Sequence, residues 1–542
     1  MYTILRYLSL FVFCVITSIN SIAYTGEIVK SLKTPGNNST GLTYDGKYFW
    51  LADRKEDKIF CIDTKSNKII KSIDSPGYWP MGLTWDGEAL WNVDIKGGIP
   101  LSENYNATIY RISLDDGTIL RTFKAPAKWA RGLAWDGEYL WCVDQQKREL
   151  IQFDSEDGTT IRKIKAPSWD PRGLTWDGKY LWVSDRNDDE IYMVNPDDGT
   201  VIIIMKAPGK FTRGLAWDGD ALWAVDSQVD NLFEIKVNDG VNFVKSNKYK
   251  AKVDYTYQIT NFGPGKVKKA DVFFAIPENR ENQKINGEIR FSPNVNDIVT
   301  DQWNQKCVHF ELENIAAGER RELHMVTTAE LSEVHYYIFP DKVGGREEIP
   351  EDILTLYLRD NNKYQLHHPV IVDAVKKAVG NETNPYWISR NILKYIIKNM
   401  YYKMDGGWNT APTVLARGNG SCSEYSFVYI AMCRAAGIPA RYVGAVVSRD
   451  KESNMDDVFH RWVEIYLPNY GWIPVDPSGG DQDTPRNQAR YFGSIGNNYL
   501  ITTQSGGGSN TLGWTYNSNE ALITESKTNV VYEYFAEWET IE

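Results

Sequence analysis

Cysteine and histidine are scarce in this chain of 542 residues, which contains six of each. The five cysteines beyond residue 23 lack the paired spacing of zinc sites, and the histidines do not complete one. We therefore expect neither a metal nor a cofactor. An odd number of cysteines in an exported chain leaves at least one thiol unpaired, which suits a nucleophile.

Long apolar runs and an excess of positive charge are also missing. The formal net charge is −11, which argues against nucleic acid or an anionic surface as the main partner. One apolar run, residues 8–16, follows Arg6 and precedes the small-residue pattern Ser21-Ile22-Ala23. This predicts a signal peptide over residues 1–23 and a secreted, periplasmic or cell-surface protein without a membrane span.

Glycine and tryptophan, by contrast, recur at regular intervals in residues 24–244. The phrase Gly-Leu-Thr/Ala-aromatic-Asp-Gly starts at five positions separated by 41, 50, 41 and 41 residues, and the extra length falls near residues 96–100. Each copy continues into a Trp and, three residues later, an Asp. Alternating strands with Asp-Gly turns at this period predict an all-β propeller of five blades, with residues 26–32 completing the last blade.

Aromatic residues precede the Gly-Leu pair in four copies, with an arginine in three of them, and we expect these residues at one rim of the propeller channel. They could bind a glycan, a carboxylate or a peptide or protein partner. Alternatively, each arginine pairs with a repeated Asp of the neighbouring unit. The repeat resembles bacterial five-bladed propellers, and faintly those of the glutaminyl-cyclase type. The rim residues are Trp79, Trp129, Arg131, Trp169, Arg172, Phe211 and Arg213.

A different pattern of alternation begins near Asn247. Short strands separated by turns over residues 245–343 predict a β-sandwich of about 100 residues. The remaining segment, 344–542, combines helices and strands and ends in a β extension. We expect it to be an α+β catalytic domain.

Cys422 lies between a glycine-rich segment and the start of an apolar run that ends before Gly437. This predicts a buried helix that begins close to Cys422. At a helix N-terminus the macrodipole and the free backbone N–H groups favour a thiolate, and those N–H groups could also hold an oxyanion.

His460 is the only histidine after Cys422 in the sequence. It opens an alternating strand, 460–466; residues 468–471 form a turn, and 472–476 form the return strand. In this hairpin His460 and Asp476 lie on one face, diagonally offset. His460 would take the proton of Cys422, and Asp476 would orient the imidazole ring.

Four motifs in this region resemble the transglutaminase-like superfamily of papain-type cysteine enzymes, over roughly residues 350–505. The resemblance implies a triad of Cys422, His460 and Asp476 and an oxyanion-stabilising side chain upstream, for which Trp387 and Trp408 both qualify. The sandwich resembles the Ig-like domain that often precedes such domains in bacteria. The motifs are G-x-G-x-C at 418–422, R-A-x-G-I-P-A-R at 434–441, H-x-W-x-E at 460–464 and W-x-P-x-D-P at 472–477.

The chemistry expected from these residues is acyl transfer through a thioester on Cys422. A protein or peptide amide is the substrate; water as acceptor gives a protease or amidase, and an amine gives a transglutaminase. Resemblance favours hydrolysis. The alternative is a non-catalytic surface protein that uses the propeller to bind a glycan or protein partner.

Overall fold

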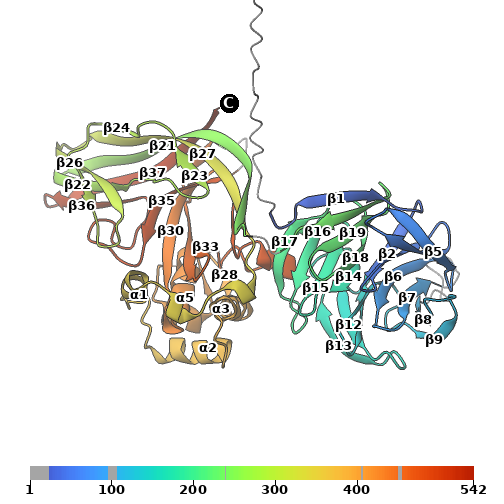
Figure 1. Ribbon diagram of the computed structural model, residues 1–542. Coiled ribbons are helices and arrows are strands. Elements are labelled where there is room, and N and C mark those ends of the chain that lie inside the picture. The colour runs from blue at the N-terminus through green and yellow to red at the C-terminus, as the bar shows by residue number, and fades with distance from the viewer. Residues whose placement is uncertain (1–23, 96–106, 238–239, 405–406, 450–453, 542) are drawn as a thin grey trace, which may run out of the picture.

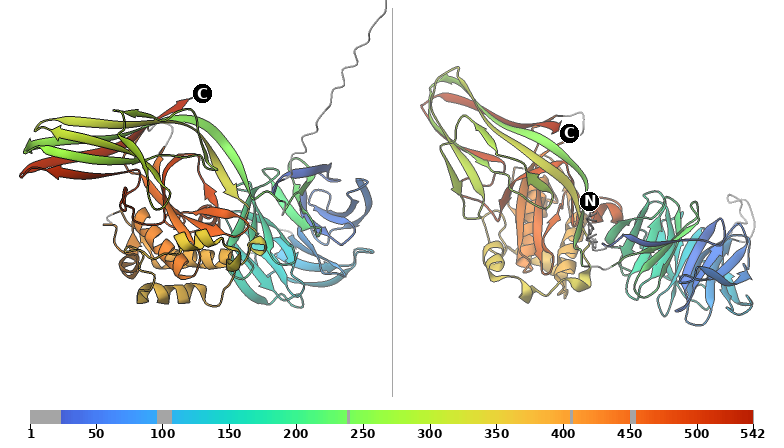
Figure 2. Two further views of the ribbon diagram at one scale, coloured as in Figure 1. Left: turned by 60° about the vertical axis from the view of Figure 1, so that its left-hand side comes forward. Right: turned by 45° about the horizontal axis from the view of Figure 1, so that its top comes forward.

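The computed structural model describes residues 24–95, 107–237, 240–404, 407–449 and 454–541 (Figure 1). The signal peptide expected over 1–23 and the extra loop expected near 96–100 lie outside these residues. Among the described residues, no helix has the length and apolar character needed to cross a membrane. Figure 2 shows the sheets of the repeat region beside a second body, in which long strands arch over a group of helices.

The repeat region consists of five four-stranded antiparallel sheets. Four of them are formed by consecutive strands: β2 (Ser39–Tyr44), β3 (Phe49–Asp53), β4 (Lys58–Asp63) and β5 (Lys68–Asp74); β6 (Pro80–Trp85), β7 (Leu90–Ile95), β8 (Ala107–Ile112) and β9 (Ile119–Lys124); β10 (Ala130–Trp135), β11 (Leu140–Asp144), β12 (Glu149–Phe153) and β13 (Thr160–Lys165); and β14 (Pro171–Trp176), β15 (Leu181–Asp185), β16 (Glu190–Val194) and β17 (Val201–Lys206). In the fifth, the opening strand β1 (Ile28–Lys33) pairs with β20 (Asn231–Ile235), beside β19 (Leu222–Asp226) and β18 (Thr212–Trp217).

The first strands of the five repeat units lie side by side in a closed cycle, in the order β2, β6, β10, β14 and β18. The repeated glycines allow this approach. A Cβ atom on Gly132 would lie 2.7 Å from the carbonyl oxygen of Arg172, and one on Gly214 would lie 2.8 Å from the backbone nitrogen of Leu42. Because any side chain would collide with the next strand, glycine is required at these positions.

The repeated Trp and the Asp of each Asp-Gly turn form a hydrogen bond within every unit. The carboxylate accepts the indole N–H of the Trp five residues later, at 2.7 or 2.8 Å, and also caps its own turn. Each indole is therefore buried while its N–H group keeps a hydrogen-bond partner, which explains why the two residues repeat together. The pairs are Asp45–Trp50, Asp86–Trp91, Asp136–Trp141, Asp177–Trp182 and Asp218–Trp223.

The next region forms two sheets that share one hydrophobic core. The first is built on β21 (Phe243–Pro264), which pairs with β27 (Arg320–Tyr336) and β37 (Thr528–Ile541), with short additions from β23 (Gln283–Ile285), β24 (Arg290–Ser292), β31 (Met455–Asp456) and β34 (Ser494–Ile495). The second contains β25 (Asp297–Thr300), β26 (Lys306–Ile315), β22 (Val267–Ala275) and β36 (Ser518–Thr524).

The C-terminal strands belong to this two-sheet region and not to the segment that the sequence assigns to the catalytic domain. β36 pairs with β22, and β37 pairs with β21 along most of its length. The sequence boundary at residue 344 separates strands that the fold joins, because hydrogen bonding between strands far apart in the chain leaves no local signal.

The remaining residues form an antiparallel sheet covered by helices. The sheet order is β33 (Gly471–Val475), β32 (His460–Leu467), β30 (Ala440–Val447) and β35 (Tyr499–Ser505). The other elements are the 3₁₀ helices Pro340–Lys342 and Arg346–Glu348, α1 (Glu351–Tyr357), α2 (Pro369–Val379), α3 (Pro385–Asn399), β28 (Tyr401–Tyr402), α4 (Ala411–Arg417), β29 (Asn419–Gly420), α5 (Cys422–Ala435) and α6 (Pro485–Ala489). Helix α5 packs against β32 and is flanked by α2, α3 and α4. This buries nearly all of its residues.

Ion pairs join the repeat region to this sheet-and-helix domain. Arg486 of α6 contacts the carboxylate of Glu190 in β16 at 2.6 and 3.0 Å, and Arg490 reaches the same carboxylate at 2.8 Å. Arg390 of α3 donates to the carbonyl oxygen of Val201. Since Glu190 is mostly buried, these contacts position the two regions relative to each other.

Candidate active site

Cys422 is the first residue of α5, as its sequence predicts. Gly418 is the C-cap residue of helix α4, and its φ of 76° lies in the left-handed region that favours glycine. At Gly420 a Cβ atom would lie 2.8 Å from the Cβ of Glu424, so this position also requires glycine. The two glycines turn the chain sharply into α5 and leave the thiol partly exposed at its N-terminus.

Glu424, in the first turn of α5, holds this turn in place. Its carboxylate is fully buried and accepts hydrogen bonds from Arg417 at 2.8 Å and from the backbone N–H groups of Asn409 at 3.0 Å and Ser421 at 3.2 Å. Sequence reasoning missed this residue, although Ser at 421 followed by Glu at 424 is the spacing of a capping box. The acidic group also complements the positive end of the helix dipole.

His460 and Asp476 lie at the ends of the predicted hairpin. Nε2 of His460 lies 2.7 Å from Oδ2 of Asp476. The other carboxylate oxygen accepts the backbone N–H groups of Ser478 and Gly479 at 3.0 and 2.9 Å and the Ser478 hydroxyl at 2.8 Å. The carboxylate is therefore fixed from both sides, and the second nitrogen of the imidazole ring is left for Cys422.

Two aromatic side chains hold the ring of His460. Trp462 and Tyr499 each stack near it, with centroid distances of 5.7 and 5.8 Å and interplanar angles of 25° and 29°. This restricts the rotation of the imidazole, so that the orientation set by Asp476 is retained.

The favourable charge interactions run through the His460 ring, to Cys422 and to Asp476. Burial raises the pKa of the Cys422 thiol, but hydrogen bonds to the His460 ring and to the backbone of Arg461 outweigh it and lower that pKa below its ordinary value. Burial lowers the pKa of His460, yet the Asp476 carboxylate and the Cys422 thiolate raise it to about 10. The pKa of Asp476 is lowered, against its own burial, by the charge of His460. At neutral pH this arrangement favours a thiolate and an imidazolium.

The structure separates the two tryptophans that the sequence leaves as alternatives. Trp408 stacks on Tyr516 at 6.2 Å, and burial together with the nearby Cys422 raises the pKa of Tyr516. Trp387 lies in α3 and lines a hollow together with Lys179 and Tyr180 of the repeat region. Trp408 is thus the tryptophan on the side of Cys422.

Arg461 is a further residue that sequence reasoning did not single out. Its side chain is fully buried, and four aromatic rings surround the guanidinium at 4.4 to 5.2 Å: Trp408, Phe427, Tyr442 and Tyr516. One nitrogen donates to the carbonyl oxygen of Trp514 at 2.6 Å. Cation–π contacts of this kind stabilise the packing of the four rings around Arg461.

The other four described cysteines differ from Cys422. Cys61, Cys142, Cys307 and Cys433 are all buried and free of disulfides. Burial raises the pKa of each thiol. They therefore lack thiolate character at neutral pH, and Cys433 of α5 packs in the hydrophobic core.

One group of side chains has the composition of a metal site. Asp271, His309 and Glu311 have ligand atoms within 4.8 Å of one another on the second sheet of the two-sheet region. Lys269 forms ion pairs with both carboxylates, and the His309 nitrogens contact Asp271 and Asp297. These contacts already engage both nitrogens of His309 and an oxygen of each of Asp271 and Glu311.

The aromatic residues and the arginines expected at the rim lie in different parts of the fold. The aromatic residues precede the first strands of their sheets, and Trp169 is half exposed. The arginines lie within β10, β14 and β18 and not on the preceding loops. Guanidinium groups stack on Trp79, Trp129 and Trp169 at 4.1, 5.5 and 3.9 Å. The residues concerned are Trp79, Trp129, Arg131, Trp169, Arg172, Phe211 and Arg213.

Residues 373–477 match the family model of the transglutaminase-like superfamily. The chain therefore carries a transglutaminase-like domain, which contains Cys422, His460 and Asp476. An uncharacterized protein of Haemophilus influenzae is 29% identical over 130 residues, covering 20% of this chain and 35% of that protein. The uncharacterized protein YebA of Bacillus subtilis is 27% identical over 155 residues, covering 27% of this chain and 20% of that protein. The chain thus spans well under half the length of these relatives.

Solved structures also show similarity at low identity. A candidate cysteine protease from Cytophaga hutchinsonii is 15% identical, with a TM-score of 0.40, covering 55% of this chain and 93% of that chain. The glutaminyl cyclase of Myxococcus xanthus is 14% identical, with a TM-score of 0.34, covering 39% of this chain and 96% of that one. Neither likeness defines an activity for this chain.

Proposed function

We propose that the protein is a cysteine enzyme that cleaves or transfers protein or peptide amides through a thioester on Cys422. One observation carries the proposal: the thiol at the N-terminus of α5 lies beside His460, which lowers the pKa of the thiol, and Nε2 of that ring lies 2.7 Å from Asp476. Nucleophile, base and orienting carboxylate are the three parts that thiol catalysis requires.

The proposed reaction begins with attack of the Cys422 thiolate on an amide carbonyl carbon. The carbonyl oxygen becomes an oxyanion, which the N–H groups at the start of α5 and the Trp408 indole would stabilise. The His460 imidazolium gives its proton to the departing amine, and a thioester remains. His460, now neutral, removes a proton from water or from a second amine, which attacks the thioester and regenerates the thiolate.

In this proposal the other regions bind a ligand and hold it in place relative to the catalytic domain. The proposal includes a five-bladed β-propeller for the five repeat sheets, acting as a binding module, and an Ig-like domain for the two-sheet region. The closed order of the first strands and the contacts between Glu190 and α6 support this. In this arrangement the module holds a ligand at a fixed position relative to the catalytic domain.

Brief iodoacetamide treatment followed by intact-mass spectrometry tests the nucleophile. We expect rapid addition of a single label to the wild type and to Cys433→Ala, none at that rate to Cys422→Ala, and slower labelling of His460→Ala. Equal, slow labelling of the wild type and His460→Ala would instead favour the non-catalytic alternative, a surface scaffold that binds a glycan or protein through the repeat region.

The acyl acceptor requires a second measurement. Incubation of a protein digest with the enzyme and a labelled primary amine separates the two reactions. New peptide termini or released ammonia without amine incorporation indicate hydrolysis, whereas incorporation of the label indicates amine transfer. Cys422→Ala serves as the control for both readouts.

A further inference from the structure

Five arginines gather where the first strands of the repeat sheets meet. Arg131, Arg172 and Arg213 each stand immediately before the glycine at which neighbouring strands approach most closely. Arg54 and Arg186 each follow the repeated Asp at the end of the second strand of their sheets. We call these five residues the guanidinium cluster. The closed order of the strands brings them together from four of the five sheets.

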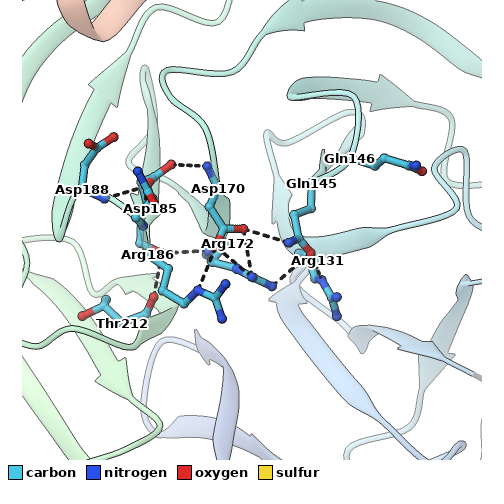
Figure 3. Close-up of polar contacts among 12 residues, drawn as sticks. Arg131, Gln145, Gln146, Asp170, Arg172, Asp185, Arg186, Asp188 and Thr212 are labelled. Atoms are coloured by element: carbon cyan, nitrogen blue, oxygen red, sulfur yellow. Dashed lines mark hydrogen bonds and ion pairs between the residues drawn. The ribbon is translucent and has the colours of Figure 1, made fainter. Parts of the chain in front are cut away.

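Asp170 supplies negative charge within the cluster (Figure 3). Its carboxylate lies 2.9 Å from Arg172 and 2.8 Å from Arg186. The neutral side chain of Gln145 accepts hydrogen bonds from Arg131 at 2.7 Å and from Arg172 at 3.0 Å. Within the cluster, one carboxylate and one amide oxygen thus contact three of the guanidinium groups.

The repeated Asp residues do not neutralise the cluster in the way that the sequence alternative supposes. Asp53 accepts the backbone N–H groups of Asn38, Lys55 and Glu56 at 2.9, 2.9 and 3.0 Å. Asp185 accepts backbone N–H groups in the same way. Their carboxylates cap turns, and Asp185 acts on Arg172 through its charge and not through a hydrogen bond between described residues.

Among the residues that the structure describes, none is a counter-ion to Arg213. Its side chain forms no hydrogen bond or ion pair with any residue that the structure describes, and its Nε is buried. Burial and the neighbouring guanidinium groups of Arg172, Arg131, Arg54 and Arg186 lower the pKa of Arg213 to about 10. The Nε of Arg172 is also buried without a partner. Unpaired buried donors and adjacent like charges are both unfavourable, so the cluster gains stability from any anion that it binds.

We propose that the guanidinium cluster is a binding site for a compact oxyanion of at least two charges, either a phosphate group or closely spaced carboxylates. Planar guanidinium forks match the oxygens of both groups and bind them in pairs. A compact ligand fits better than a long polyanion. The chain has a formal net charge of −11, so the parts of a long polyanion that extend beyond the cluster would be repelled. The inference rests on the proposed role of the repeat region as a binding module, and does not depend on the catalytic proposal.

Isothermal titration calorimetry of the full chain with inorganic phosphate and with citrate tests this site, against sodium chloride at matched ionic strength. We expect saturable one-to-one binding by the wild type and by Cys422→Ala. Arg213→Gln should bind at least about tenfold more weakly, since each charge-assisted hydrogen bond contributes strongly. Its thermal midpoint without ligand should not fall, because the substitution removes an unpaired charge.

Arg162→Gln is the matched control, since Arg162 lies on the outermost strand β13 and bonds to Gln152; it should bind phosphate like the wild type. Titrations with triglutamate and with trigalacturonate compare the two sources of carboxylates: tighter binding of triglutamate indicates a peptide ligand, and tighter binding of trigalacturonate indicates a sugar ligand. Absence of saturable phosphate and citrate binding, or equal affinity in Arg213→Gln, overturns the oxyanion site. Binding of neutral lactose in place of the anions would overturn it while keeping the repeat region as a binding module.

Discussion

Asp476 reaches His460 across the hairpin along a diagonal. The strand register pairs Val463 with Val475, so Asp476, which follows β33, is not directly opposite His460, which opens β32. Its Oδ2 nevertheless lies 2.7 Å from Nε2 of the ring. The carboxylate spans this offset because Ser478 and Gly479 hold its other oxygen.

Asp476→Asn should raise the pKa of Cys422 and lower that of His460. The carboxylate is a main cause of the raised pKa of His460, and without it the imidazolium is less stable and supports the thiolate less. The pH midpoint of iodoacetamide alkylation should therefore move upward, and peptide turnover should fall about 100-fold. Stopped-flow alkylation across pH measures the shift; an unchanged midpoint would show that Asp476 does not act on the ring.

Trp408→Phe and Trp387→Phe should have different consequences. Trp408 is on the side of Cys422, so loss of its indole N–H should lower kcat by about 100-fold with little change in KM, as expected for an oxyanion donor. Trp387→Phe should leave kcat unchanged. Steady-state kinetics on one peptide substrate compares them, and equal effects of the two substitutions would exclude Trp408 from this role.

Glu424→Gln should loosen the entry to α5. The buried carboxylate bonds to Arg417 and to the N–H groups of Asn409 and Ser421, and hydrogen bonds to a charged group contribute about 1.5–3 kcal/mol each. We expect faster hydrogen–deuterium exchange over residues 407–424 and slower alkylation of Cys422. Asp74→Asn removes an exposed ion pair with Lys58 and should change neither. Unchanged exchange in Glu424→Gln would contradict the anchoring role.

The junction at Glu190 should weaken in acid. Burial raises the pKa of this carboxyl, but Arg486 and Arg490 lower it below its ordinary value of 4.5. Its contribution is therefore complete above pH 4.5 and is lost as the pH falls from there through the lower pKa of the folded state. Small-angle scattering should show an expanding radius of gyration in that range. Glu190→Gln should show the expansion already at neutral pH, and a wild-type radius in that variant would argue against the role of the junction.

Much of the candidate site could be predicted from the sequence because its signals are local. Glycines at 418 and 420, an apolar run after Cys422 and a turn between two alternating strands define the helix start and the hairpin. The choice between Trp387 and Trp408 could not be made, since both lie upstream of Cys422 and only packing shows which one approaches it. Arg461 gave no signal either, because its aromatic cage is drawn from four separate segments.

The sequence by itself determined the repeating units, the order of the regions and the residue types at 422, 460 and 476, because each depends on neighbours within a few tens of residues. Only the tertiary structure decided that strands 518–541 join the sheets of β21 and β22. It also decided that five arginines share one location with Asp170. Both depend on contacts between residues far apart in the chain, where neither hydrophobic period nor turn chemistry specifies a partner.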